Sequence, residues 1–198
     1  MKKSMFPLCG RCESKECRNG KDCFSQADNH RQLYQDKLTA ELHKAASAIE
    51  GRYYGKETRL SEIILFAEEL KYKKLGLAFC IGLSEEAKVI EQIFSKHFEV
   101  VSVCCKVCGI DKKDFGLSQI KPKNHEVMCN PAGQAQILNN AETQFNVICG
   151  LCVGHDAIFA KLSDAPVTML IAKDRVLAHN PAAAIYCQYI RKHFGKNT

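Results

Sequence analysis

The chain has 198 residues, of which 46% are hydrophobic and 25% are charged, proportions typical of a soluble globular protein with one ordinary domain and a small appendage. No apolar run approaches the roughly 18 residues of a membrane span, and the N-terminus lacks the apolar core of a signal peptide, so we expect a cytoplasmic protein that does not contact membranes. The net charge of +6 is spread among charges of alternating sign, which favours a solvated surface over a nucleic-acid site, although contact with a polyanion stays open.

The N-terminal segment is rich in cysteine and poor in apolar residues. With no export signal, twelve cysteines indicate metal or thiol chemistry rather than disulfides. Four of them follow the spacing C-x2-C-x4-C-x5-C, at Cys9, Cys12, Cys17 and Cys23. A short polar segment cannot bury enough surface to fold alone, whereas four thiolates on zinc, or on a cubane iron–sulfur cluster, supply the folding energy. We predict a four-cysteine metal-binding knot over residues 1–27. We favour zinc, because the short intervals differ from the common ferredoxin spacing.

Two helices are expected next, as a helical linker over residues 28–74. Asp28 or Asn29 can cap a helix that runs to about Ile49, with leucine, alanine and isoleucine along one stripe. A second helix is expected from roughly Thr58 to Lys73, and its apolar face has a similar spacing.

From residue 75 to 198 the pattern alternates between buried strands and helices. Strands are expected at 75–83, 100–104, 145–153 and 166–172, and helices at 84–98, from Asn130, at 156–162 and at 180–194. Proline in the first helical position supports the helix that Asn130 caps. Such alternation is typical of a parallel sheet covered on both faces. The predicted fold is therefore α/β: a mostly parallel open sheet flanked by helices, with the N-terminal knot and linker attached.

Soft and basic side chains follow several of the predicted strands. In an open α/β sheet ligands bind beyond the carboxyl ends of the strands, so these residues are expected to converge. They are Cys105, Lys106, Cys129, Cys152, His155, Lys173 and His179. By contrast Cys80, Cys149 and Cys187 lie within predicted elements and are interpreted as small packing residues. The candidates for catalysis are Cys129, Cys152, His155 and Cys105.

Cys129 is the strongest of these candidates, because it precedes a helix whose first turn carries no acidic side chain. The positive end of that helix favours a thiolate. Cys129 is therefore a candidate nucleophile, redox thiol or metal ligand. A buried, inert cysteine is the alternative, and burial would raise the pKa instead.

Several blocks together resemble an uncharacterised Cys-rich "metal-binding protein" family, a domain of unknown function associated mainly with anaerobic prokaryotes. Besides the N-terminal cysteines, the blocks are Cys104–Val107, Cys129–Pro131 with Gln134–Ala135, Gly150–Asp156 and Ala172–Leu177. The resemblance covers nearly the whole chain. It implies metal binding at the N-terminal cysteines, and its anaerobic setting raises the weight of iron–sulfur. It implies no reaction, substrate or partner.

Three functions remain open at this stage. The first is a metal-binding protein whose thiol-rich cleft performs redox or thiol chemistry. The second is a non-enzymatic zinc-knuckle module that binds nucleic acid or protein. The third is a protein that holds and passes on soft metal ions.

Overall fold

A computed structural model describes residues 8–122 and 124–195, so the first seven residues of the predicted knot lie outside the described residues. The chain divides into two compact units, Met1–Ala48 and Ile49–Thr198. Among the described residues, no helix combines the length and the apolar character that crossing a lipid bilayer requires.

The N-terminal unit begins with two short 3-10 helices, η1 (Cys9–Arg11) and η2 (Glu16–Asn19), neither of which buries a residue. Two α-helices follow, α1 (Ala27–Leu33) and α2 (Lys37–Tyr53), where the sequence predicted a single helix. The Asp36 carboxylate accepts a hydrogen bond from the Thr39 N–H at 2.8 Å, an N-cap interaction that starts a new helix. The first helix starts at Ala27, because the Asp22 carboxylate accepts the Ala27 N–H at 2.9 Å.

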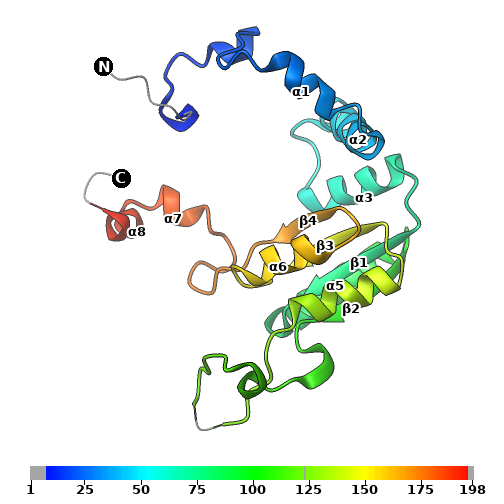
Figure 1. Cartoon of the computed structure of the whole chain (residues 1–198), viewed down its shortest axis with the longest axis vertical. Coiled ribbons are helices and arrows are strands. Elements are labelled where there is room, and N and C mark those ends of the chain that lie inside the picture. Colours follow the sequence, from blue (N-terminus) through cyan, green and yellow to red (C-terminus); the bar gives the residue numbers. More distant parts are fainter. Residues whose placement is uncertain (1–7, 123, 196–198) are drawn as a thin grey trace. The chain divides into compact units, whose positions relative to one another are not determined.

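The C-terminal unit is built on a four-stranded sheet with the order β2-β1-β3-β4 (Figure 1). The strands are β1 (Lys74–Phe79), β2 (Glu99–Cys104), β3 (Phe145–Cys149) and β4 (Val167–Ile171). All three pairings are parallel, which confirms the predicted parallel sheet. β1 is shorter than predicted, because its chain turns into the 3-10 helix η3 (Ile81–Leu83).

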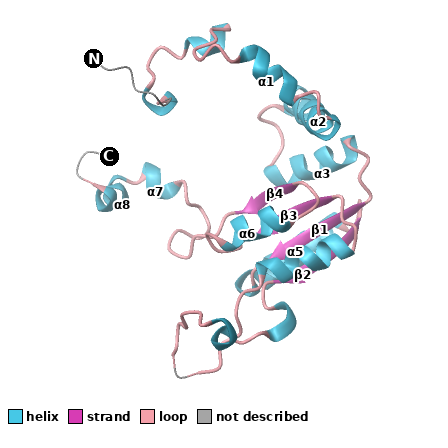
Figure 2. Ribbon diagram, viewed as in Figure 1, coloured by secondary structure: helices cyan, strands magenta, loops and turns pink. Residues whose placement is uncertain are grey.

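Helices cover both faces of the sheet (Figure 2). α3 (Arg59–Glu69) and α4 (Ser84–Phe94) lie on one face, where Phe66 of α3 packs on Phe145 of β3. α5 (Pro131–Asn140) and α6 (His155–Leu162) contact each other on the opposite face. The predicted cap of α5 is confirmed, since the Asn130 side chain accepts the Gly133 N–H at 2.8 Å.

The C-terminal segment differs from the single helix that the sequence predicted over residues 180–194. It contains two single-turn helices, α7 (Ala183–Tyr186) and α8 (Gln188–Arg191), and the 3-10 helix η6 (Lys192–Phe194). The backbone of Cys187 is extended, with φ −80° and ψ 110°, and this interrupts the helical hydrogen bonding. Unlike Asn130, Asn180 caps no helix with its side chain, because α7 begins three residues later.

Small residues on β1 let α5 approach the sheet closely. A Cβ atom added at Gly76 would lie 2.0 Å from Asn146 Oδ1 and 2.8 Å from Leu138 Cδ1. Gly76, Ala78 and Cys80 are every second residue of the chain, so all three point to this face of the sheet and Cys80 points towards α5.

Replacing Gly76 by alanine is expected to destabilise the fold by about 1–3 kcal/mol, the usual cost of overpacking a core. Gly51 in α2 is a matched control, because a Cβ there meets nothing within 4 Å. Gly51→Ala should stabilise the protein by about 1 kcal/mol through helix propensity. Urea titrations of both variants measure the two shifts; equal midpoints would contradict the close packing of α5 on β1.

Candidate functional site

The ladder of the parallel sheet continues one residue beyond β1 and β2. The Cys105 N–H donates to the Phe79 carbonyl at 2.8 Å, and the Cys80 N–H donates to the Cys149 carbonyl at 3.1 Å. Because Phe79 is the register partner of Cys104, Cys80 and Cys105 occupy the next matched positions. Matched positions in a parallel sheet point to the same face, here the face that α5 covers.

The start of α5 brings a third cysteine to these two. The Asn130 N–H donates to the Cys105 carbonyl at 2.8 Å, which fixes Cys129 beside the end of β2. Lys106 Nζ donates to the Val127 carbonyl at 2.6 Å and holds the incoming chain. The long loop before it is closed by an ion pair of 2.7 Å between Lys112 and Glu126, which are mostly buried.

A buried glutamine connects α5 to the ends of both strands. Gln134 is fully buried, and its Nε2 donates to the carbonyl oxygens of Phe79 at 3.1 Å and Val103 at 2.6 Å. These carbonyls belong to the residue before Cys80 and to the second residue before Cys105. Gln134 therefore fixes the distance between the helix that follows Cys129 and the strands that carry the other two thiols.

Cys129 and Cys105 form a hydrogen-bonded pair with opposite ionisation. The hydrogen bond with Cys105 lowers the pKa of Cys129 to about 5, against the opposing effect of burial, and the charges of Lys106 and His155 lower it further. The same hydrogen bond, together with burial, raises the pKa of Cys105 well above its ordinary value. At neutral pH the half-buried Cys129 is therefore a thiolate, and Cys105 is the thiol that donates to it.

Cys80 lies on the other side of Cys105. Burial opposes its ionisation, but hydrogen bonds with Lys173 and with the Gly82 backbone lower the pKa of Cys80 overall. Cys105 contributes to this lowering as well. Sequence reasoning interpreted Cys80 as a packing residue. It is indeed 7% exposed, but its position directly after β1 was the signal of a place at the functional edge.

Cys152 and His155 reach this edge from the end of β3. Arg175 Nη2 donates to Cys152 Sγ at 2.9 Å, and the same guanidinium interacts electrostatically with Cys80 and Cys129. His155, the first residue of α6, acts electrostatically on Cys129. Of the two lysines predicted near this edge, Lys106 lowers the pKa of Cys129, whereas Lys173 lowers the pKa of Cys80. Arg175 was not singled out, although it follows β4 closely.

Cys149 and His179 take no part in this cluster. The pKa of Cys149 rises to about 12, because it is buried and near the Glu86 carboxylate. Its interpretation as a packing residue agrees with this burial. His179 contacts Asp174 instead, since its Nδ1 accepts the Asp174 N–H at 3.1 Å. We call Cys80, Cys105, Cys129 and Cys152 the edge cysteines.

The N-terminal cysteines are all exposed. The Cys12 N–H donates to the Cys9 carbonyl at 3.2 Å, so this pair frames a turn, and Cys17 lies in the next turn, η2. Within residues 8–122 and 124–195, no three histidine, cysteine or acidic side chains are gathered into a group that could hold a metal. The predicted four-cysteine knot is thus not assembled in this structure.

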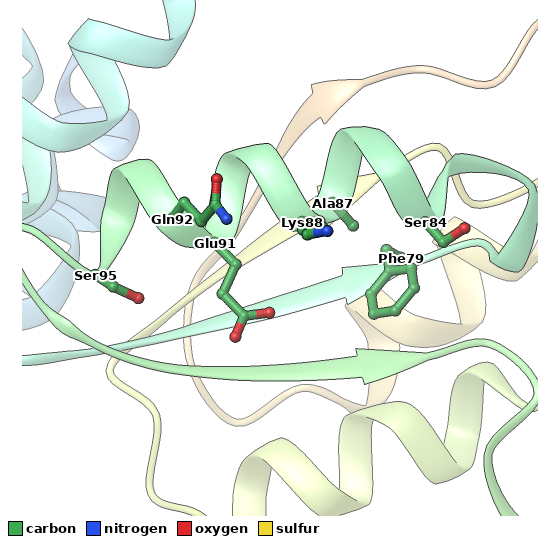
Figure 3. Close-up of a pocket in the computed structure, with 7 residues that line it drawn as sticks. All are labelled: Phe79, Ser84, Ala87, Lys88, Glu91, Gln92 and Ser95. Carbon is green, nitrogen blue, oxygen red and sulfur yellow. The ribbon is translucent and has the colours of Figure 1, made fainter.

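A hollow of about 510 Å³ lies on the opposite face of the sheet, between α4 and the strands (Figure 3). Its lining includes Phe79, Lys88 and Glu91, and the Glu91 carboxylate accepts the Ser102 hydroxyl at 2.6 Å. No cysteine lines this hollow. The reactive groups identified above are therefore on the α5 face, and not in this hollow.

The charge state of Cys129 can be measured by alkylation with iodoacetamide across a pH series. We expect the rate at Cys129 to be half-maximal near pH 5, because only the thiolate reacts. Cys105→Ala removes the donor that stabilises this thiolate, so the midpoint should rise towards the ordinary value of about 8.5. Cys149 serves as the internal unreactive control. A midpoint at Cys129 unchanged by Cys105→Ala would contradict the pairing.

Similarity to known sequences places the chain in a family. The family model described as "Protein of unknown function (DUF1847)" matches residues 18–170, a range that contains all the edge cysteines. "Uncharacterized protein MJ0455" of Methanocaldococcus jannaschii is 51% identical over 185 residues, which cover 93% of this chain and 96% of that protein. No solved structure matches the chain. The chain therefore belongs to the DUF1847 family of proteins of unknown function.

Proposed function

We propose that the protein is a thiol–disulfide oxidoreductase in which Cys129 attacks a disulfide substrate and Cys105 resolves the intermediate. The observation that carries this proposal is the placement of the half-buried Cys129 beside the buried Cys105, which the hydrogen bond from the Asn130 N–H to the Cys105 carbonyl fixes. The lowered pKa of Cys129 and the raised pKa of Cys105 support it. A thiolate is the nucleophile in disulfide exchange, and a second thiol beside it completes the reaction.

In the first step the Cys129 thiolate attacks one sulfur of a disulfide R–S–S–R′. A bond forms between Cys129 Sγ and R–S, and R′–S⁻ leaves. Lys106 and His155 are positioned to stabilise negative charge near Cys129. The half-buried state of Cys129 leaves it open to a substrate, unlike Cys105, which is 2% exposed.

In the second step Cys105 gives its proton to R′–S⁻ and attacks Cys129 Sγ. The Cys105–Cys129 disulfide forms, and R–S⁻ leaves and takes a proton from water. This step becomes easier once Cys129 is bonded to R–S. The negative charge of Cys129 is then gone, and that charge had helped to raise the pKa of Cys105. The substrate is reduced to two thiols, and a dithiol reductant restores the protein.

Single-turnover reaction of the reduced full chain with hydroxyethyl disulfide tests this mechanism. Peptide mass spectrometry should find Cys105–Cys129 as the first linkage to form in the wild type, and a mercaptoethanol adduct trapped on Cys129 in Cys105→Ser. Cys129→Ser should form neither species. Cys104→Ser is the matched control, because Cys104 is adjacent in sequence but points to the other face of β2. Trapping on Cys105 in the Cys129→Ser variant would refute the assignment of the nucleophile.

A metal centre at Cys9, Cys12, Cys17 and Cys23 is a second and separate proposal. It is supported by four exposed thiols, of which Cys9, Cys12 and Cys17 lie in or directly after two 3-10 turns that bury no residue. The donor set fits zinc, which takes four thiolates, and it also fits an iron–sulfur cluster. Since the four thiols are not gathered in this structure, binding would draw these turns together and couple metal uptake to local folding.

Metal analysis of the anaerobically purified full chain tests this second proposal. We expect one zinc ion per chain and no visible absorption, whereas a brown protein would indicate the iron–sulfur alternative. Cys12→Ser should lower the metal content severalfold. Cys108→Ser, which removes an exposed cysteine outside the segment, should not. A metal-free wild type, or full metal content in Cys12→Ser, would contradict the proposal.

A further inference from the structure

Cys105 has a thiol neighbour on each side. Cys129 lies at the start of α5, and Cys80 lies at the matched position after β1. Both neighbours raise the pKa of Cys105. Cα atoms on neighbouring strands are about 4.8 Å apart, which is within the range that a disulfide bridges. Cys105 can therefore bond to either neighbour without a rearrangement of the strands.

Cys80 also has its own cation. A Cβ atom at Gly82 would lie 3.8 Å from Lys173 Nζ and 3.9 Å from Cys80 Sγ, so the ammonium and the thiol both border the space beside this glycine. The Ile81 N–H donates to Cys105 Sγ at 3.3 Å and orients that sulfur beside β1. A residue that only filled space would need neither the ammonium partner nor the contact with Cys105.

We propose that Cys80 is a third catalytic thiol. It attacks Cys105 in the Cys105–Cys129 disulfide, forms a Cys80–Cys105 disulfide and so releases Cys129 for a second attack. This inference rests on the proposed oxidoreductase function. The Cys80 thiolate attacks Cys105 Sγ, the Cys105–Cys129 bond breaks, and Cys129 leaves as a thiolate. The exchange converts one disulfide into another and needs no oxidant, because electrons and protons balance within the three cysteines.

The direction of this exchange follows from the leaving group. A thiol of low pKa leaves faster, and the pKa of Cys129 is about 5 in the reduced site. Lys173 assists the attacking thiolate of Cys80, and Lys106 assists the departing thiolate of Cys129. The resulting Cys80–Cys105 disulfide lies between residues that are 7% and 2% exposed, whereas Cys129 is again open to substrate.

The exchange leaves a specific chemical signature. With excess hydroxyethyl disulfide, the wild-type chain should end with a Cys80–Cys105 linkage and a mercaptoethanol adduct on Cys129. In Cys80→Ser the Cys105–Cys129 linkage should accumulate, and Cys129 should carry no adduct. A time course quenched with N-ethylmaleimide and mapped by peptide mass spectrometry follows both linkages. Cys104→Ser is the control, and should behave as the wild type does.

Lys173 provides a test that leaves the three sulfurs in place. Lys173→Met should slow the conversion of Cys105–Cys129 into Cys80–Cys105 severalfold, because the ammonium that favours the thiolate of Cys80 is lost. Lys173→Arg keeps the positive charge and should restore most of the rate. This readout distinguishes a catalytic Cys80 from a cysteine that merely packs.

The outcomes separate the two proposals. If Cys105–Cys129 forms and persists in the wild type while Cys80 stays fully alkylable, the relay is refuted and the oxidoreductase proposal stands. If neither linkage forms and Cys129 carries no adduct, the proposed function itself fails, and the relay fails with it.

Discussion

The thiol site depends on one backbone hydrogen bond, from the Cys105 N–H to the Phe79 carbonyl, which extends the β1–β2 ladder past the ends of both strands. This bond keeps Cys80 and Cys105 in register and points both side chains to the α5 face. Gln134 reinforces it, because its amide donates to the same Phe79 carbonyl. The cap at Asn130 then fixes where α5 begins, and with it the place of Cys129.

The face of the sheet to which each cysteine points determines the pKa of its thiol, and so its reactivity. Cys149 ends β3 but points to the α4 face, where burial and Glu86 raise its pKa to about 12. Cys80 and Cys129 lie near Lys173 and Lys106, and their pKa values fall. Residues of one chemical type, a few ångströms apart, thus become inert or reactive through the charges that neighbouring elements supply. The strand order contributes as well, since it reverses between β1 and β3, where open sheets bind ligands.

The two cysteine groups of this chain have different physical origins. The N-terminal cysteines are close in sequence, exposed, and carried by turns with no buried residue, so their association needs an added ligand. The edge cysteines come from four separate segments of the chain and are assembled by the sheet itself. A reagent or metal that acts on the N-terminal cysteines therefore probes the local folding of that segment. A reagent that acts on the edge cysteines reports on the integrity of the core.

The sequence alone determined the flanked parallel sheet, the approximate positions of all four strands and the cap at Asn130, because hydrophobic periodicity and helix-cap chemistry are local properties. It also brought Cys105, Cys129 and His155 to one edge through the general rule for parallel sheets. Only the tertiary structure decided that Cys105, Lys106 and His155 act together to lower the pKa of Cys129. Only it paired Lys173 with Cys80 and Arg175 with Cys152. Such pairings depend on strand order, register and side-chain direction, which no local pattern in the sequence encodes.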